Sequence, residues 1–128
     1  MERRTVSSGA PWEAVVGYSR AVRVGSWVSV AGTTAAGPDG RAAEGAGPAD
    51  QTRTAISRIG AALEQVGSGL SDVVRTRIYL VDISHWEEVG RVHGEFFATI
   101  RPAASLVQVS ALIDPTLLVE VEADAVVG

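Results

Sequence analysis

Short runs of strand-forming residues, most with alternating apolar and polar positions, recur along the chain. Alternation is typical of β-strands, because successive side chains of a strand point to opposite faces. The predicted strands are Arg4–Ser7, Tyr18–Val24, Trp27–Ala31, Val73–Ile83, Ala104–Ala111 and Leu117–Val127. The turn signal Asp114-Pro115 separates the last two, so the sequence predicts that they form a hairpin.

Two other segments have the apolar spacing of helices. In Asp50–Val66 one apolar stripe consists of Ile56, Ile59, Leu63 and Val66, and Gly67 follows as a stop signal. The second helix is expected to begin at Ser84, where Glu87 three residues later completes a capping-box pattern. Its apolar face holds Trp86, Val89, His93, Phe96 and Phe97, and Pro102 follows it.

After the short edge strand Arg4–Ser7, the order of these elements is β-β-α-β-α-β-β, which predicts one α+β domain over residues 1–128. We expect a mixed β-sheet with both helices on one face. The second face would then carry Leu106 or Val107 with Val109, and Leu118 or Val119. A homo-oligomer that buries this face is the physical expectation.

Composition narrows the possible chemistry. The chain has no Cys and no Lys, which excludes thiolate catalysis, zinc–thiolate sites, disulfides and a lysine Schiff base. A net charge of −4 argues against nucleic-acid binding, which needs a basic surface. No apolar run approaches the ~20 residues of a membrane span, and no secretory signal is recognisable, so we expect a cytoplasmic protein without a membrane partner.

Three carboxylates, Glu120, Glu122 and Asp124, fall on one face of the last predicted strand. Their steps of roughly 6.5–7 Å along the strand are too long for one metal ion without other ligands, so no metal site is predicted. Glu122 and Asp124 are interpreted as a polar outer face. His93 is interpreted as a partly buried packing residue and His85 as exposed.

The ordered series of segments resembles the RidA/YjgF family, which is also called endoribonuclease L-PSP. The segments are GYSRAV (17–22), VSVAGTTA (28–35), DQTRTAISRIGAALEQVG (50–67), DVVRTRIYLVDISHWEEV (72–89), HGEFF (93–97), RPAASLVQVSAL (101–112) and VEVEADAV (119–126). The resemblance implies a chorismate-mutase-like fold and a homotrimer whose sheets form a central barrel. It also implies small-molecule clefts between subunits, in which reactive enamines and imines are hydrolysed without a metal or organic cofactor.

The resemblance assigns roles to four positions of this sequence. Glu120 matches the Glu that is thought to hold the attacking water, and Tyr18 matches the Tyr that closes the cleft. Gly32 matches the Gly of a Ser-Gly step, although Ala31 replaces the Ser. Ser105 matches the Ser that follows the substrate-binding Arg.

The chain departs from the family pattern at three further positions. Ala104 stands where the family has the Arg that clamps a substrate carboxylate, Leu106 replaces a Cys, and Gly90 replaces a frequent Asn. The sequence leaves open whether another arginine takes over, and the candidates are Arg20, Arg75, Arg77 and Arg101.

The leading hypothesis is therefore a Rid-family homotrimer that acts on a small metabolite other than a simple 2-imino acid. Hydrolysis or tautomerisation of an imine, enamine or enol would use Glu120 as the acid/base or water-positioning group. The alternative is a non-catalytic trimer that binds a metabolite or regulates. Ribonuclease activity, suggested by the older family name, is disfavoured by the acidic charge and the lack of Lys.

Overall fold

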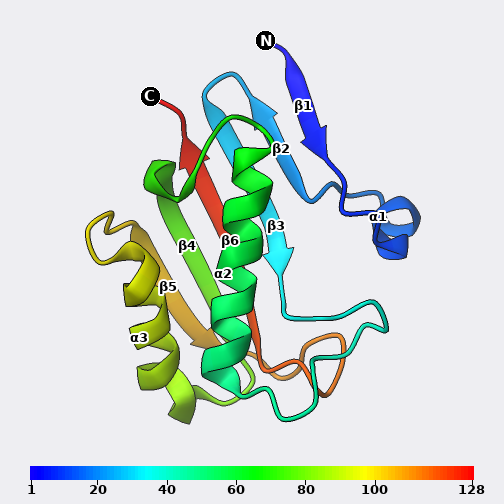
Figure 1. Cartoon of the computed structure of the whole chain (residues 1–128), viewed down its shortest axis with the longest axis vertical. Coiled ribbons are helices and arrows are strands. Elements are labelled where there is room, and N and C mark those ends of the chain that lie inside the picture. Colours follow the sequence, from blue (N-terminus) through cyan, green and yellow to red (C-terminus); the bar gives the residue numbers. More distant parts are fainter.

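The computed structural model describes residues 1–128, and its centre is one mixed sheet of six strands (Figure 1). The strands are β1 (Arg3–Val6), β2 (Ala21–Val24), β3 (Trp27–Thr33), β4 (Val73–Leu80), β5 (Ala103–Gln108) and β6 (Val119–Val126). Their order in the sheet is β1-β2-β3-β6-β4-β5, and only β4 and β5 pair in parallel. The predicted α+β class with a mixed sheet is confirmed.

Two helices, α2 (Pro48–Glu64) and α3 (Trp86–Phe97), cover the same face of the sheet (Figure 1). The two short helical turns are η1 (Leu70–Asp72) and η2 (Ile83–His85). The core lies between the helices and the sheet, where Val119 and Val121 of β6 and Ile56 and Leu63 of α2 are all 0% exposed. None of the helices is long and apolar enough to span a membrane.

A third helix, α1 (Pro11–Val16), occupies a segment in which the sequence predicted no helix. Pro11 stands at its first position, and Gly17 ends it with a φ of 87°, a conformation that glycine adopts without strain. Only Glu13 of this helix is buried. Such a short helix with one buried residue leaves no apolar periodicity to detect.

The predicted hairpin between the last two strands is wrong. β4 lies between β5 and β6, and it pairs in parallel with β5 and antiparallel with β6. Parallel neighbours need a crossover, and α3 supplies it between β4 and β5. The turn at Asp114 therefore belongs to a long connection that carries the chain past β4.

The predicted capping box at Ser84 is also wrong. Ser84 lies in the turn η2, and the carboxylate of Asp82 accepts hydrogen bonds from its amide at 2.9 Å and its hydroxyl at 2.7 Å. α3 begins only at Trp86, and its N-cap, His85, makes no side-chain capping bond. The Asp82 carboxylate thus accepts the hydrogen bond from the Ser84 amide that the predicted capping box assigned to the Glu87 side chain.

The face of the sheet away from α2 and α3 is more polar than the sequence predicted. Val119 points into the core, and Leu106 packs against the core as well. Of Leu106, Val107 and Val119, only Val107 therefore lies on the open face. Arg77 pairs with Asp124 at 3.2 Å and with Glu122 at 3.6 Å. Two of the three β6 carboxylates are therefore engaged by a cation from β4.

Candidate active site

Glu120 lies near the start of β6 on the open face of the sheet, where it packs directly against Gly32. Strand pairing places Glu120 opposite Tyr79 of β4. On its other side the register between β3 and β6 shifts between Val30 and Thr33, the stretch that contains Gly32. A Cβ added to Gly32 would lie 2.9 Å from both Cδ and Oε2 of Glu120. The absence of a side chain at position 32 thus creates the space in which the carboxylate sits.

Tyr18 and Arg20 belong to the same cluster, although both precede β2 rather than lying in it. The Arg20 guanidinium stacks over the Tyr18 ring, with Cζ 5.7 Å from the ring centroid. Its Nη2 donates a hydrogen bond of 2.6 Å to the Gly32 carbonyl oxygen. The backbone holds this arrangement, because the Ala31 amide donates to the Arg20 carbonyl oxygen at 3.0 Å.

The surroundings of Glu120 favour its protonated form. Burial raises the pKa of the Glu120 carboxyl, the negative charge of Glu122 raises it further, and the positive charge of Arg20 opposes both effects. No protein group donates a hydrogen bond to this carboxylate. A half-buried carboxylate with free acceptor positions and a raised pKa is suited to hold a water molecule and take a proton from it.

The structure does not bring Ala104 and Ser105 to this cluster within one chain. Ala104 pairs with Thr76 on the side of the sheet that carries the helices, whereas Glu120 lies on the open side. β4 also lies between β6, which carries Glu120, and β5, which carries Ala104. The two residues are therefore about 10 Å apart across the sheet. The predicted site residues therefore form two groups: Tyr18, Gly32 and Glu120 in one, and Ala104 and Ser105 in the other.

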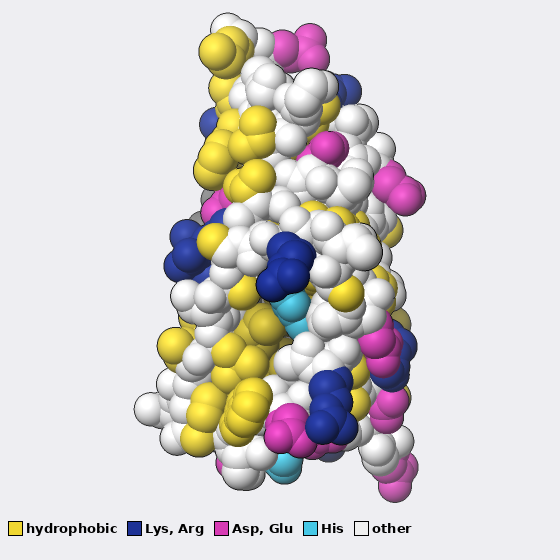
Figure 2. Space-filling model, turned by 90° about the vertical axis from the view of Figure 1, so that its left-hand side faces the viewer, with side chains coloured by type: hydrophobic (Ala, Val, Ile, Leu, Met, Phe, Trp, Pro, Cys, Tyr) yellow, Lys and Arg dark blue, Asp and Glu magenta, His cyan; other side chains and the backbone are white.

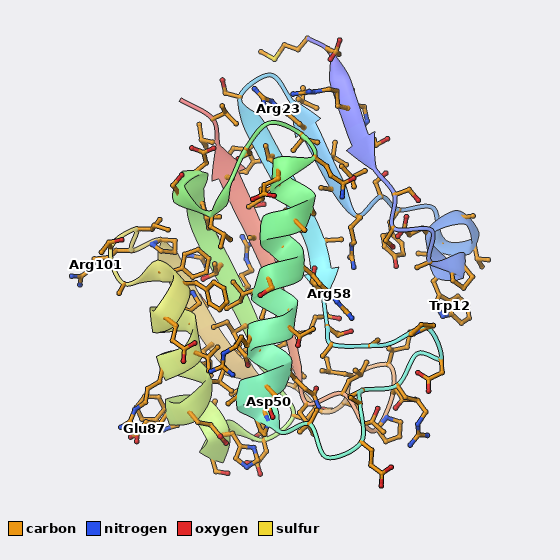
Figure 3. The ribbon with its side chains drawn as sticks, in the orientation of Figure 1. Trp12, Arg23, Asp50, Arg58, Glu87 and Arg101 are labelled. Atoms are coloured by element: carbon orange, nitrogen blue, oxygen red, sulfur yellow. The ribbon has the colours of Figure 1, made fainter.

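The structure separates the four arginines that could compensate for Ala104. Arg75 donates to the Ser105 hydroxyl at 3.2 Å, and Arg77 pairs with two β6 carboxylates. Arg101 is exposed in the loop after α3, with a φ of 57°, and points away from the body of the chain (Figure 3). Only Arg20 lies beside Glu120 and Gly32.

One further contact lies on the open face around Glu120. The Tyr79 hydroxyl donates to Glu122 at 2.7 Å, and this hydrogen bond raises the pKa of the tyrosine. Sequence reasoning missed Tyr79, because it lies in the apolar half of its strand and gives no polar signal. No grouping of His, Asp and Glu side chains in the structure could hold a metal ion.

Two hollows of the single chain lie elsewhere. One of about 860 Å³ is bounded by the 35–46 loop and the start of α2, and another of about 460 Å³ lies along α2 near Arg58. Neither includes Glu120. Apolar side chains also gather on the surface at the β5 and α3 edge (Figure 2).

His93 has the packing position that the sequence predicted. It is half-buried, its Nε2 lies 2.9 Å from the Thr76 hydroxyl, and its ring centroid lies 4.6 Å from that of Phe97. Burial lowers the pKa of the His93 imidazole. His85, expected to be exposed, is partly covered.

Comparisons with known proteins agree with this fold. The family model described as endoribonuclease L-PSP matches residues 8–127. A crystal structure from Mycobacterium tuberculosis, of a member of the YjgF/YER057c/UK114 family, is 56% identical, with a TM-score of 0.89 over 98% of this chain and all of that one. A protein of Streptomyces coelicolor is 42% identical over 98% of this chain and 92% of its own length.

Imine deaminases are among the relatives. The human 2-iminobutanoate/2-iminopropanoate deaminase is 29% identical over 98% of this chain and 91% of its own length. The fold, the family match and these relatives lead to one conclusion: this chain belongs to the RidA/YjgF family, also called endoribonuclease L-PSP.

Proposed function

We propose that this protein hydrolyses a small imine or enamine without a cofactor, with Glu120 as the water-positioning acid/base. The observation that supports this most directly is the half-buried Glu120 carboxylate, which packs on Gly32 and receives no hydrogen bond from the protein. Family membership, with imine deaminases among the relatives, supports the same chemistry.

The reaction needs one water molecule and two proton transfers. The water oxygen bonds to the imine carbon while Glu120 takes a proton from the water. This proton then passes to the nitrogen, which gives a carbinolamine. Glu120 carries the remaining hydroxyl proton to the same nitrogen, the C–N bond breaks, and ammonia leaves as the carbonyl forms. An enamine first gains a proton at carbon and loses one from nitrogen, which gives the imine. Every atom of imine and water appears in the carbonyl compound and ammonia.

We further propose that the site is completed by a second copy of the chain in a cytoplasmic homotrimer with a barrel-like arrangement of sheets. Glu120 and Ala104 lie on opposite faces and two strands apart, so one chain cannot place both against one small ligand. A neighbouring subunit can bring its Ala104–Ser105 edge to the Glu120 cluster. A cleft between copies would also cover the sheet face that α2 and α3 leave open (Figure 1).

Ala104 constrains the substrate. A methyl side chain cannot hold a carboxylate, whereas the guanidinium expected there forms a bidentate pair with one. We therefore propose that the substrate is not a simple 2-imino acid bound in the usual family orientation.

A second candidate function is metabolite binding without catalysis. Ala104 favours this function, because it replaces the arginine that holds the substrate in the family pattern. The Glu120 cluster would then bind a metabolite through Arg20 and the cleft walls. Binding of the metabolite, and not its conversion, would carry the regulatory signal. This protein would be a regulatory trimer.

Ammonia release from imines generated in situ separates the two functions. The panel contains imines of neutral amines and of amino acids, and each rate is compared with the uncatalysed rate. Glu120→Gln should remove the enzymatic acceleration. Glu122→Gln is the matched control, because it removes a neighbouring carboxylate that Tyr79 and Arg77 already engage.

Sedimentation of the same variants tests the assembly. A trimer for wild type and for Glu120→Gln would show that the lost rate reflects chemistry and not dissociation. Rates equal to the uncatalysed reaction for every imine, with a melting temperature raised by one of the metabolites, would replace the hydrolase proposal with the binding function. Equal rates for wild type and Glu120→Gln would contradict the role of Glu120.

A further inference from the structure

Arg20 has hydrogen-bond donors that the protein leaves unused. Of its five N–H groups, one on Nη2 binds the Gly32 carbonyl oxygen at 2.6 Å. Its Nε is buried and has no partner, and no protein acceptor reaches Nη1. A buried, unpaired N–H group is costly, so a position like this one is usually completed by a bound water or a ligand.

The position of Arg20 is fixed by the backbone on both sides. Its amide donates to the Val6 carbonyl oxygen at 2.7 Å, and its carbonyl oxygen accepts from the Ala31 amide at 3.0 Å. The Tyr18 ring and the Gly32 carbonyl then hold the guanidinium itself. Such a guanidinium loses little freedom when a ligand binds, which favours recognition.

Arg20 also acts on Glu120 without forming an ion pair with it. Its charge lowers the pKa of the Glu120 carboxyl, yet the two side chains are not in salt-bridge contact. Both groups touch Gly32, one at its carbonyl oxygen and the other at the place of its missing side chain. Arg20 therefore keeps its free donors on the same wall of the site as the water-positioning carboxylate.

The other arginines lack this combination. Arg75 shares the buried, unpaired Nε, but its Nη2 donates to Ser105 on the β5 side of the sheet, away from Glu120. Arg77 pairs with the β6 carboxylates. Arg101 is free but lies at the α3 and β5 edge, opposite the edge that carries α1 and Trp12 (Figure 3). Arg20 binds the Gly32 carbonyl oxygen and so lies on the Glu120 side of the sheet. Arg101 directly precedes β5 and so lies on the Ala104 side.

We propose that Arg20 is the group that binds the carboxylate of the ligand, in place of the arginine missing at Ala104. This inference rests on the proposed function for the identity of the site. The ligand would bind in the opposite orientation to that of the family pattern. Its carboxylate binds on the wall that carries Glu120, and the small Ala103–Ala104 edge contacts the rest of the ligand. The favoured ligands are small carboxylates whose imine or carbonyl carbon lies within reach of the water on Glu120.

Calorimetric binding of 2-oxobutanoate to the whole protein tests this without turnover. Arg20→Gln should weaken binding at least about tenfold, as expected for loss of a charge-assisted hydrogen bond. Arg20→Lys should restore part of it. Arg101→Gln, which removes the same charge from an exposed arginine, is the matched control and should bind like wild type. Butan-2-one, the neutral probe, should bind weakly to all of them.

A pH profile of turnover gives a readout that a merely structural role would not change. Without Arg20 the pKa of Glu120 loses the influence that lowers it, so the acid limb of the profile should move to higher pH in Arg20→Gln. Arg20→Lys should keep the wild-type limb. Circular dichroism and sedimentation of each variant check that the fold and the assembly are intact.

The outcomes separate this inference from the proposed function. Arg20-dependent binding of 2-oxobutanoate by a protein that hydrolyses no imine would support the Arg20 assignment and reject the hydrolase. Imine hydrolysis with the same KM and binding in wild type, Arg20→Gln and Arg101→Gln would reject Arg20 and keep the hydrolase. Two other results would overturn the Arg20 assignment. One is that wild-type protein binds no 2-oxobutanoate at millimolar concentration, and the other is that Arg101→Gln loses as much binding as Arg20→Gln.

Discussion

Gly32 and Glu120 fit together in a way that only a glycine allows. A Cβ at position 32 would lie 2.9 Å from the Cδ of Glu120, closer than real Cβ contacts come. The glycine is needed for the approach of this side chain and not for an unusual backbone angle, since Gly32 does not have a positive φ. The shape of the site therefore depends on a missing methyl group.

Gly32→Ala should reduce turnover much more than stability. The new methyl group would push the Glu120 carboxylate away, and a displacement of about 1 Å at a catalytic group can cost about a hundredfold in rate. Steady-state kinetics and thermal unfolding of the same preparation measure the two effects. Gly90→Ala on α3 is the control, because nothing lies within 4 Å of the added Cβ. It should stabilise the helix by up to about 1 kcal/mol. Wild-type turnover in Gly32→Ala would contradict the contact.

Glu120→Gln should make the protein more stable at neutral pH while it removes activity. The folded-state pKa of Glu120 is raised above its unfolded value, chiefly by burial. The folded state then binds more protons, so this group lowers stability as pH rises from the unfolded pKa through the folded pKa. Glutamine does not titrate, and the melting temperatures of variant and wild type should converge near pH 4 and separate by pH 7. A lower melting temperature for the variant at pH 7 would argue that ionised Glu120 stabilises the fold.

The alternation in β6 was sufficient to predict which of its side chains are buried. Val119 and Val121 are 0% exposed, whereas Glu120 and Glu122 lie on the open face. Strand partners could not be predicted in the same way. The turn at Asp114 fits a hairpin by its local sequence, but α3 returns the chain to the far side of β4. Local turn signals carry no information about a strand inserted from elsewhere.

The site was only partly predictable for a similar reason. Glu120, Gly32 and Tyr18 could be assigned from the family resemblance, and the structure brings them together with Arg20. The contact between Arg20 and the Gly32 carbonyl depends on the register shift of β3, which no residue pattern encodes. Spacing along the sequence also could not show that Ala104 faces the helix side while Glu120 faces the open side.

His93→Gln should make the stability of the protein less sensitive to mild acid. Burial lowers the folded-state pKa of His93 below its usual value, so the unfolded chain binds more protons as pH falls below about 6.5. The neutral imidazole therefore contributes stability above that pH, and this contribution decreases as pH falls. Glutamine can keep a hydrogen bond to Thr76 and does not titrate. Urea unfolding at pH 7 and pH 5 should show a smaller loss of free energy in the variant, and an equal loss would assign the acid sensitivity to other groups.

Glu13→Ala should loosen the segment that leads into the site. Glu13 is 7% exposed and accepts hydrogen bonds from the Ser7 hydroxyl, at 2.8 Å, and from the Ser8 hydroxyl and amide. These bonds, the one from the Ser8 hydroxyl above all, lower the pKa of Glu13. The stability they give is complete above the unfolded pKa and is lost as pH falls through the folded pKa.

Glu13→Ala should lower the free energy of unfolding by about 2 kcal/mol at pH 7, as expected for removal of charge-assisted hydrogen bonds. This loss of stability should become smaller in acid. Because α1 leads directly into Tyr18, the KM for the substrate should rise as well. Glu64→Ala, an exposed carboxylate at the end of α2, is the control and should change neither quantity. A loss of stability that is the same at pH 3 and pH 7 would mean that packing of the side chain, and not its ionised hydrogen bonds, holds α1 in place.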